Sequence, residues 1–232
     1  IMLMAPIGVF ALITKTITTL AVGEGGEANL GQIGTVLGAL SYYCIAVIIG
    51  LLLHTTIVYL GLLKLFTPLK ISQFFKAIAP AQLLAFSTSS SGATLPVTMR
   101  QCKEKLGASK ETTSFVLPLG ATINMDGTAL YQAVAAVFIA QAYSIPLDLG
   151  AQITIILTAV MASIGTAAVP GAGIIMLVII LEAINVPTAG IALILGVDRI
   201  LDMLRTATNV TGDAAVCAII AHSEKQLHPP SE

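Results

Sequence analysis

The stretch LDMLRTATNVTGD, residues 201–213, decides the fold, because it places three charged side chains within an otherwise apolar segment. On a helix that turns about 100° per residue, five polar residues of this region fall within about 80° of one another. They are Asp198, Asp202, Arg205, Asn209 and Asp213. A charge in the core of a bilayer costs about 2.5–3.5 kcal/mol or more, so this polar stripe must face protein or water. A salt-bridge seam between helices is the structural alternative, but three acids against one base leave room for added cations.

The rest of the 232-residue chain is strongly apolar, with 56% hydrophobic and only 10% charged residues. Soluble domains carry about 25% charged residues, so this composition excludes a soluble enzyme, and it equally excludes intrinsic disorder. A formal net charge of −1 excludes a nucleic-acid-binding surface. The apolar runs are long and continuous, which predicts an all-α polytopic membrane protein and not a β-barrel.

The cysteines and the start of the chain carry less information. The three cysteines are scattered, without a CxxC motif, and indicate neither a metal site nor a disulfide framework. The sequence opens inside an apolar segment and shows no signal peptide, so we expect it to be the C-terminal part of a longer protein.

Loop charges predict how the apolar segments cross the membrane. Loops 64–76 and 100–111 carry lysine and arginine, which favours the cytoplasm, whereas loop 23–28 carries glutamate and is expected outside. Segment 77–99 then begins and ends on the cytoplasmic side and is predicted to be a re-entrant hairpin. Segment 149–186 is broken near its centre by glycine and proline, and we expect a second hairpin that enters from outside. The C-terminus is predicted to be cytoplasmic.

Two similar units follow each other along the chain. The first unit carries SSSGATLP (89–96) and then NMDGT (124–128); the second carries GTAAVPGAG (165–173) and then NVTGD (209–213). Because the two hairpins are expected to enter from opposite sides, the units form a candidate inverted-topology repeat, an arrangement typical of secondary transporters.

Polar residues inside the apolar segments suggest ion and anion binding. Asn124 and Gly127 are poor helix formers beside Asp126, and a local unwinding there would free carbonyl oxygens that suit Na⁺, although a simple helix kink is the alternative. Six hydroxyls between Ser87 and Thr94 lie where a helix would begin, which suits an anion; a tip that only needs solvation is the alternative. A lone histidine such as His54 is more often a structural hydrogen-bonding group than a functional one.

The whole chain resembles the dicarboxylate/amino acid:cation symporter family, the sodium-coupled glutamate and aspartate transporters. The matching motifs, in the family's order, are SSSGATLP (89–96), GATINMDGTALYQ (120–132), ASIGTAAVPGAG (162–173) and LDMLRTATNVTGD (201–213). The resemblance implies a homotrimer in the plasma (inner) membrane, an elevator-like alternating-access motion and no enzyme activity or cofactor beyond the coupling sodium ions. It implies a last scaffold helix at 1–24 and a transport domain at 29–232, with the earlier scaffold helices absent. The implied transport-domain elements are a helix at 29–66, an inner hairpin at 70–108, an unwound helix at 112–143, an outer hairpin at 149–186 and an amphipathic helix at 189–223.

The resemblance also implies roles for individual residues. Arg205 matches the arginine that pairs with the substrate's side-chain carboxylate, and Asp202 matches the aspartate that holds the α-ammonium group. The full implied substrate set is Ser89, Ser90, Ser91, Thr128, Val169, Gly173, Asp202, Arg205, Thr206 and Asn209. The implied sodium set is Gly120, Thr122, Asn124, Met125, Asp126, Ser163, Ile164, Thr166, Asn209 and Asp213. An arginine that members carry at the inner tip or in the last helix is missing here, and Arg199 is the candidate for a compensating charge.

Other functions stay open at the level of sequence. Gln132 stands where potassium-coupled animal members carry an acid, which disfavours potassium counter-transport. A proton-coupled C4-dicarboxylate carrier is the alternative within the family, although a substrate without an ammonium group needs no counter-charge at Asp202. A remote alternative is an intramembrane aspartyl protease that uses Asp126 and Asp213 as a dyad, but Arg205 on the same stripe would keep nearby carboxylates ionised.

Overall fold

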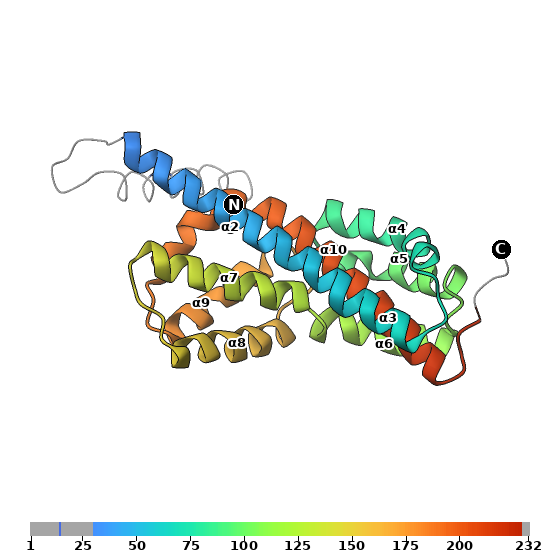
Figure 1. The fold of residues 1–232 in the computed structure, drawn as a ribbon. Helices are drawn as coiled ribbons and strands as arrows, with labels where there is room; N and C mark the ends of the chain where they lie inside the picture. The colour runs from blue at the N-terminus through green and yellow to red at the C-terminus, as the bar shows by residue number, and fades with distance from the viewer. Residues whose placement is uncertain (1–13, 15–29, 229–232) are drawn as a thin grey trace.

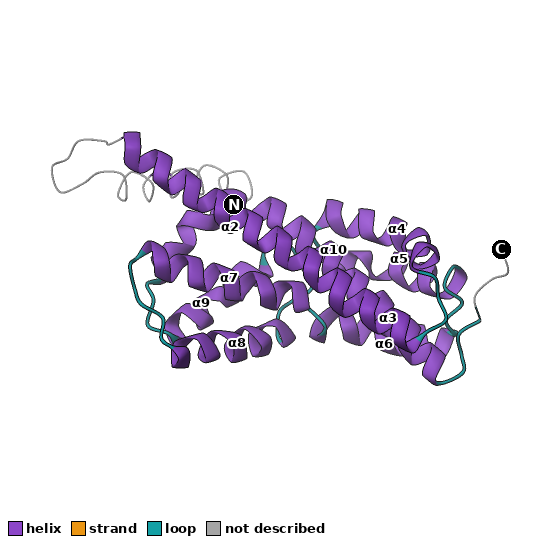
Figure 2. Cartoon of the chain, viewed as in Figure 1, coloured by secondary structure: helices purple, strands orange, loops and turns teal. Residues whose placement is uncertain are grey.

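The computed structural model describes Thr14 and residues 30–228, and every regular element within them is a helix (Figure 2). The predicted all-α class is therefore confirmed for this part of the chain, while the helix expected at 1–24 lies outside the described residues apart from Thr14. The elements are α2 (Leu30–Leu53), the π-helical turn η1 (His54–Tyr59), α3 (Leu60–Phe66), α4 (Ile71–Thr88), α5 (Ser91–Glu104), α6 (Lys110–Ile123), α7 (Asp126–Ala142), α8 (Leu149–Ile164), α9 (Ala172–Ala183), the short 3₁₀ turn η2 (Thr188–Gly190) and α10 (Ile191–Ser223).

Two long helical rods run the length of the molecule (Figure 1). One is formed by α2, η1 and α3 in succession, and the other is α10. Helices α7, α8 and α9 gather at one end of these rods, and α4, α5 and α6 gather at the other. Two stretches, 34–66 and 110–142, are long and apolar enough to cross a membrane.

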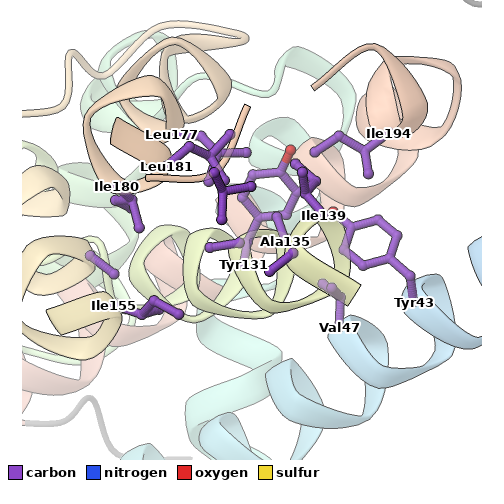
Figure 3. Close-up of a cluster of buried hydrophobic side chains, with 14 of the residues drawn as sticks. Tyr43, Val47, Tyr131, Ala135, Ile139, Ile155, Leu177, Ile180, Leu181 and Ile194 are labelled. Carbon is purple, nitrogen blue, oxygen red and sulfur yellow. The ribbon is translucent and has the colours of Figure 1, made fainter. Parts of the chain in front are cut away.

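Each end of the molecule has its own apolar core. In Figure 3, Tyr131 of α7 lies fully buried among Val47 of α2, Leu177 of α9 and Ile194 of α10. The core at the other end joins the α4–α5 hairpin to α6 and α10 and includes Phe74. The α10 residues of that second core are small: Ala214, Ala215, Cys217, Ala218 and Ala221. Small side chains let helices approach closely, which is how membrane helices gain packing energy.

Three helix interruptions lie where the sequence predicted breaks. Helix α4 ends at Thr88, Ser89 takes a left-handed conformation with φ of 53°, and the side chain of Ser90 caps α5. Asn124 and Met125 separate α6 from α7. Residues 165–171 separate α8 from α9. The side from which each hairpin would enter a membrane stays a prediction.

The residues that follow α10 bind to the loop between α5 and α6. Beyond α10, Leu227 forms an isolated antiparallel bridge with Ala108. The side-chain oxygen Oε1 of Gln226 accepts hydrogen bonds from the hydroxyls of Ser109 (2.6 Å) and Thr112 (2.7 Å). Because Ser109 also caps the N-terminus of α6, one glutamine links the start of α6 to the end of α10.

Candidate functional site

The tips of the two hairpins meet over the polar stripe of α10. The hydroxyl of Ser90 donates to the carbonyl oxygen of Ala168 at 2.7 Å, and the N–H of Gly92 donates to the same oxygen at 3.2 Å. Beneath this contact lies a cavity of about 20 Å³. Its walls are Ser89, Ser91, Met125, Thr128, Thr166, Ala167, Ala168, Val169, Gly173, Asp202, Arg205, Thr206 and Asn209. A volume of this size has room for about one water molecule, so an amino acid enters only when a wall moves.

Arg205 is the buried cation of the site, with 1% of its surface exposed. Its Nε donates to Oδ1 of Asp202 at 3.0 Å, and its Nη1 lies 3.6 Å from Oδ1 of Asp198. The guanidinium carbon lies 4.0 Å from the centre of the Tyr131 ring. Neither Nη1 nor Nη2 makes a hydrogen bond within the described residues. Asp202 thus holds the guanidinium at Nε, and the Tyr131 ring covers one of its faces. The N–H groups of Nη1 and Nη2 remain able to donate hydrogen bonds to a planar anion.

Asp198 and Tyr131 support Arg205 from behind. The Tyr131 hydroxyl donates to Oδ1 of Asp198 at 2.6 Å, and both residues are buried. Sequence reasoning placed Asp198 on the polar stripe but gave neither residue a role. The neighbouring Arg199 is exposed, so the structure leaves its role as a compensating charge a prediction.

Protein groups hold both oxygens of the Asp202 carboxylate. Its Oδ2 accepts the backbone N–H of Gly171 at 2.9 Å, while its Oδ1 accepts Nε of Arg205. Gly171 precedes α9 and has φ of 75°, which glycine adopts without strain. The outer hairpin tip is therefore fastened to the same carboxylate that the resemblance assigns to the substrate ammonium group.

Asn209 joins the start of α7 to α10. Its Oδ1 accepts the N–H of Gly127 at 2.8 Å, and its Nδ2 donates to Oγ1 of Thr128 at 3.0 Å. A Cβ at position 127 would lie 2.8 Å from this Oδ1 and 3.0 Å from the carbonyl oxygen of Arg205. Glycine at this position therefore allows the close approach of α7 to the polar stripe.

Asp213 lies at the interruption between α6 and α7. Nδ2 of Asn124 donates to Oδ1 of Asp213 at 3.0 Å, and a Cβ at Gly120 would lie 2.6 Å from the same oxygen. The carboxylate of Asp213, the amide of Asn124 and the backbone of Gly120 thus lie close together, and their role in a sodium site stays a prediction. Oxygen groups of this kind are hard ligands, which suit Na⁺ rather than a transition metal.

Asp126 is the first residue of α7 and directly follows the interruption between α6 and α7. Its Oδ2 accepts the Tyr59 hydroxyl at 3.0 Å and lies 3.2 Å from Nε2 of His54. Its side chain is 41% exposed. Sequence analysis assigned no role to Tyr59 and favoured a structural role for His54.

Five residues of the implied sodium set remain, and the resemblance groups them as a third sodium site: Thr122, Met125, Ser163, Ile164 and Thr166. Met125 is buried on the cavity wall. Ser163 and Thr166 are buried at the end of α8, and their hydroxyls donate to the carbonyl oxygens of Val160 and Ala162. Thr122 and Ile164 are exposed, and their part in a sodium site stays a prediction.

The structure therefore brings the predicted substrate set together. All of its members line the cavity except Ser90, whose hydroxyl bonds to Ala168 instead. Sequence reasoning missed Ala167 and Ala168 as wall residues. Their contribution is largely through the backbone, which carries no residue-type signal.

The chain matches known transporters over nearly its full length. The profile of the sodium:dicarboxylate symporter family matches residues 1–223. The chain is 46% identical over 222 residues to excitatory amino acid transporter 1 of Homo sapiens, covering 96% of this chain and 39% of the relative. It is 43% identical to excitatory amino acid transporter 2 of Homo sapiens over 225 residues, covering 97% and 38%. It is 44% identical to excitatory amino acid transporter 4 of Rattus norvegicus over 224 residues, covering 96% and 38%. The chain spans about two fifths of the length of these relatives.

Proposed function

Because this chain belongs to the sodium:dicarboxylate symporter family, we propose that the protein is a secondary-active symporter that moves an acidic amino acid with sodium ions across a membrane. The similar relatives are named as amino acid transporters, which supports an amino acid as the substrate. The family and the names of the relatives support a transporter and not an enzyme.

Arg205 carries the proposal. A buried guanidinium whose Nη1 and Nη2 make no hydrogen bond is costly unless an anion completes it, because buried donors need partners. The planar fork of arginine matches a carboxylate with two parallel bonds. We assign the substrate's side-chain carboxylate to these nitrogens.

Asp202 favours an amino acid over a plain dicarboxylate. Its carboxylate lies beside Arg205 on the cavity wall and offers an ammonium group a charge-assisted bond. A dicarboxylate would bring a second negative charge towards Asp202, which is unfavourable at short range in a buried site. The proton-coupled C4-dicarboxylate carrier remains the second candidate within the family.

Charge balance supports sodium as the coupling ion. Asp198 and Asp202 share Arg205. Within the described part of the chain, the side-chain partner of Asp213 is the neutral amide of Asn124, and those of Asp126 are Tyr59 and His54. An acidic substrate adds a further net negative charge, which is costly to carry through an apolar medium unless cations travel with it. We propose that Asp213 and Asp126 each help to hold one sodium ion.

The outer hairpin tip is the proposed lid. Substrate entry requires the Gly171 N–H to leave Asp202, since the cavity of about 20 Å³ is too small for an amino acid. We further propose that α4–α5 and α8–α9 are re-entrant hairpins of opposite orientation in an inverted repeat. The transport domain would move like an elevator within a plasma-membrane homotrimer and keep the C-terminus in the cytoplasm.

A substrate panel tests this function. The native full-length protein is reconstituted in lipid vesicles, and uptake of radiolabelled aspartate, glutamate, succinate and alanine is measured with inward Na⁺ or choline gradients. We expect uptake of aspartate or glutamate only with Na⁺, and little succinate or alanine uptake. Succinate uptake equal to aspartate uptake would support the dicarboxylate carrier and contradict the ammonium role of Asp202.

A further inference from the structure

The helical rod of α2, η1 and α3 contains one π-helical turn, His54–Tyr59, and this turn faces Asp126. In an α-helix two residues five positions apart point about 140° away from each other. A π-turn bonds residue i to residue i+5 and brings such residues into line, and π-turns occur often at functional sites. The rings of His54 and Tyr59 accordingly lie 4.7 Å apart, edge to face.

Both side chains of this turn reach the same carboxylate oxygen. The Tyr59 hydroxyl donates to Oδ2 of Asp126 at 3.0 Å, and Nε2 of His54 lies 3.2 Å from it. An ionised carboxylate only accepts hydrogen bonds, so the His54 tautomer with its proton on Nε2 is the one that donates to Asp126. No hydrogen bond to Oδ1 of Asp126 is found within residues 30–228, and the side chain is 41% exposed. One oxygen, Oδ2, is held by two partners, and the other has no hydrogen-bond partner among these residues.

Tyr59 is itself held in place by a close fit to α10. It is 3% exposed, and a Cβ at position 212 would overlap its phenol ring and hydroxyl. The absence of a side chain at position 212 therefore lets the phenol ring of Tyr59 pack directly against the backbone of α10. The hydroxyl therefore has a fixed position from which to hold Asp126.

We infer that His54 and Tyr59 are positioning residues that hold Oδ2 of Asp126 and aim Oδ1 at a sodium ion. The inference rests on the proposed sodium symport and adds two residues to its machinery. Removing a residue that orients a metal-binding side chain by a hydrogen bond typically lowers metal affinity by about 10–100-fold. His54 and Tyr59 act through hydrogen bonds. Another side chain at position 54 whose N–H reaches Oδ2 of Asp126 should therefore position the carboxylate equally well.

Two substitutions separate positioning from simple packing. Tyr59→Phe removes only the hydroxyl and keeps the ring against Gly212. His54→Leu removes the donor, whereas His54→Gln keeps an N–H at the place of Nε2. Tyr42→Phe is the matched control, because Tyr42 lies on the same rod and is 77% exposed.

The measurement is aspartate uptake against Na⁺ concentration in vesicles that hold the native full-length protein or a variant. We expect Tyr59→Phe and His54→Leu to raise the half-saturating Na⁺ concentration about tenfold with maximal uptake at saturating Na⁺ retained. His54→Gln and Tyr42→Phe are expected to stay within about twofold of the unaltered protein.

A second readout excludes a folding defect. The Na⁺-induced rise in Tm of the purified protein, relative to choline and without substrate, should require about tenfold more Na⁺ in Tyr59→Phe and His54→Leu. Unchanged sodium affinity in both variants overturns the inference but leaves sodium symport intact. If His54→Gln is as impaired as His54→Leu, the positioning role of the donor is wrong. An unaltered protein that responds to Na⁺ in neither assay overturns the proposed function and the inference together.

Discussion

The backbone N–H of Gly171 donates to Oδ2 of Asp202 over 2.9 Å, and this bond ties the outer hairpin tip to α10. The proposed substrate ammonium needs the same oxygen. We therefore propose that substrate and hairpin tip compete for this carboxylate, so that an amino acid binds once the tip has moved. This relationship gives the α8–α9 hairpin a chemical reason to act as a lid.

Arg205 should decide which substrates bind. Arg205→Ala removes the donor of a buried charge-assisted pair, so acidic substrates should lose at least about 2 kcal/mol of binding free energy, roughly thirtyfold in affinity. Asp202 remains able to hold an ammonium group, so neutral amino acids should become accepted. Competition binding with aspartate and alanine measures both effects, and Arg100→Ala, at an exposed site on α5, is the control. Aspartate affinity equal to that of the unaltered protein would refute the assignment.

Gly173 should be intolerant of a side chain. A Cβ there would lie 3.0 Å from Nη1 of Arg205 and 3.1 Å from Cγ2 of Thr128. Gly173→Ala should therefore push the arginine or the hairpin aside and weaken aspartate binding about tenfold, the equivalent of about 1.4 kcal/mol. Gly165→Ala, in the same hairpin, meets only one atom at 4.0 Å and serves as the control. Equal aspartate affinities for the two variants would show that close packing at Gly173 does not shape the site.

Asp213 should set sodium affinity more than substrate affinity. Asp213→Asn keeps an oxygen that can accept from Asn124 but removes the charge proposed to hold a cation. We expect the half-saturating Na⁺ concentration to rise about tenfold or more, with a smaller change in aspartate affinity at saturating Na⁺. Asp148→Asn, at the exposed N-cap of α8, is the control. An unchanged Na⁺ requirement would remove Asp213 from the sodium site.

Gln226 should matter for stability and not for transport chemistry. Gln226→Ala leaves the hydroxyls of Ser109 and Thr112 without their shared acceptor, which should cost about 1–2 kcal/mol of unfolding free energy. The Tm should fall while the affinities for Na⁺ and aspartate stay unchanged. Gln141→Ala is the control, because it removes a glutamine side chain at an exposed position of α7. A Tm equal to that of the unaltered protein would show that the chain end does not fasten α6.

Much of the fold could be predicted because its breaks use residues with strong local signals. Proline and glycine mark the outer tip, and a serine run marks the inner tip. Asn124 marks the interruption before α7, and Gly127 lies in the first turn of α7. The polar stripe on α10 followed from helical periodicity alone, and most of its residues meet at the cavity.

The π-turn and the supports of Arg205 could not be predicted in the same way. The run Thr55–Val58 is β-branched and disfavours an α-helix, which is a weak signal that gives no register. Tyr131 and Asp198 are far apart in sequence, and only the packing of α7 against α10 brings the hydroxyl to the carboxylate. Gln226, which follows α10, contacts Ser109 and Thr112 at the start of α6. These residues lie outside any periodic hydrophobic pattern, so their contact could not be predicted from the sequence.

Sodium coupling is the central claim, and the direct test is aspartate affinity in the native full-length protein as a function of Na⁺ at fixed pH and then of pH at fixed Na⁺. We predict an affinity that rises steeply with Na⁺ and changes little with pH, with a reciprocal rise in Na⁺ affinity when aspartate is present. An affinity that ignores Na⁺ and depends steeply on pH would contradict sodium coupling and identify a proton symporter.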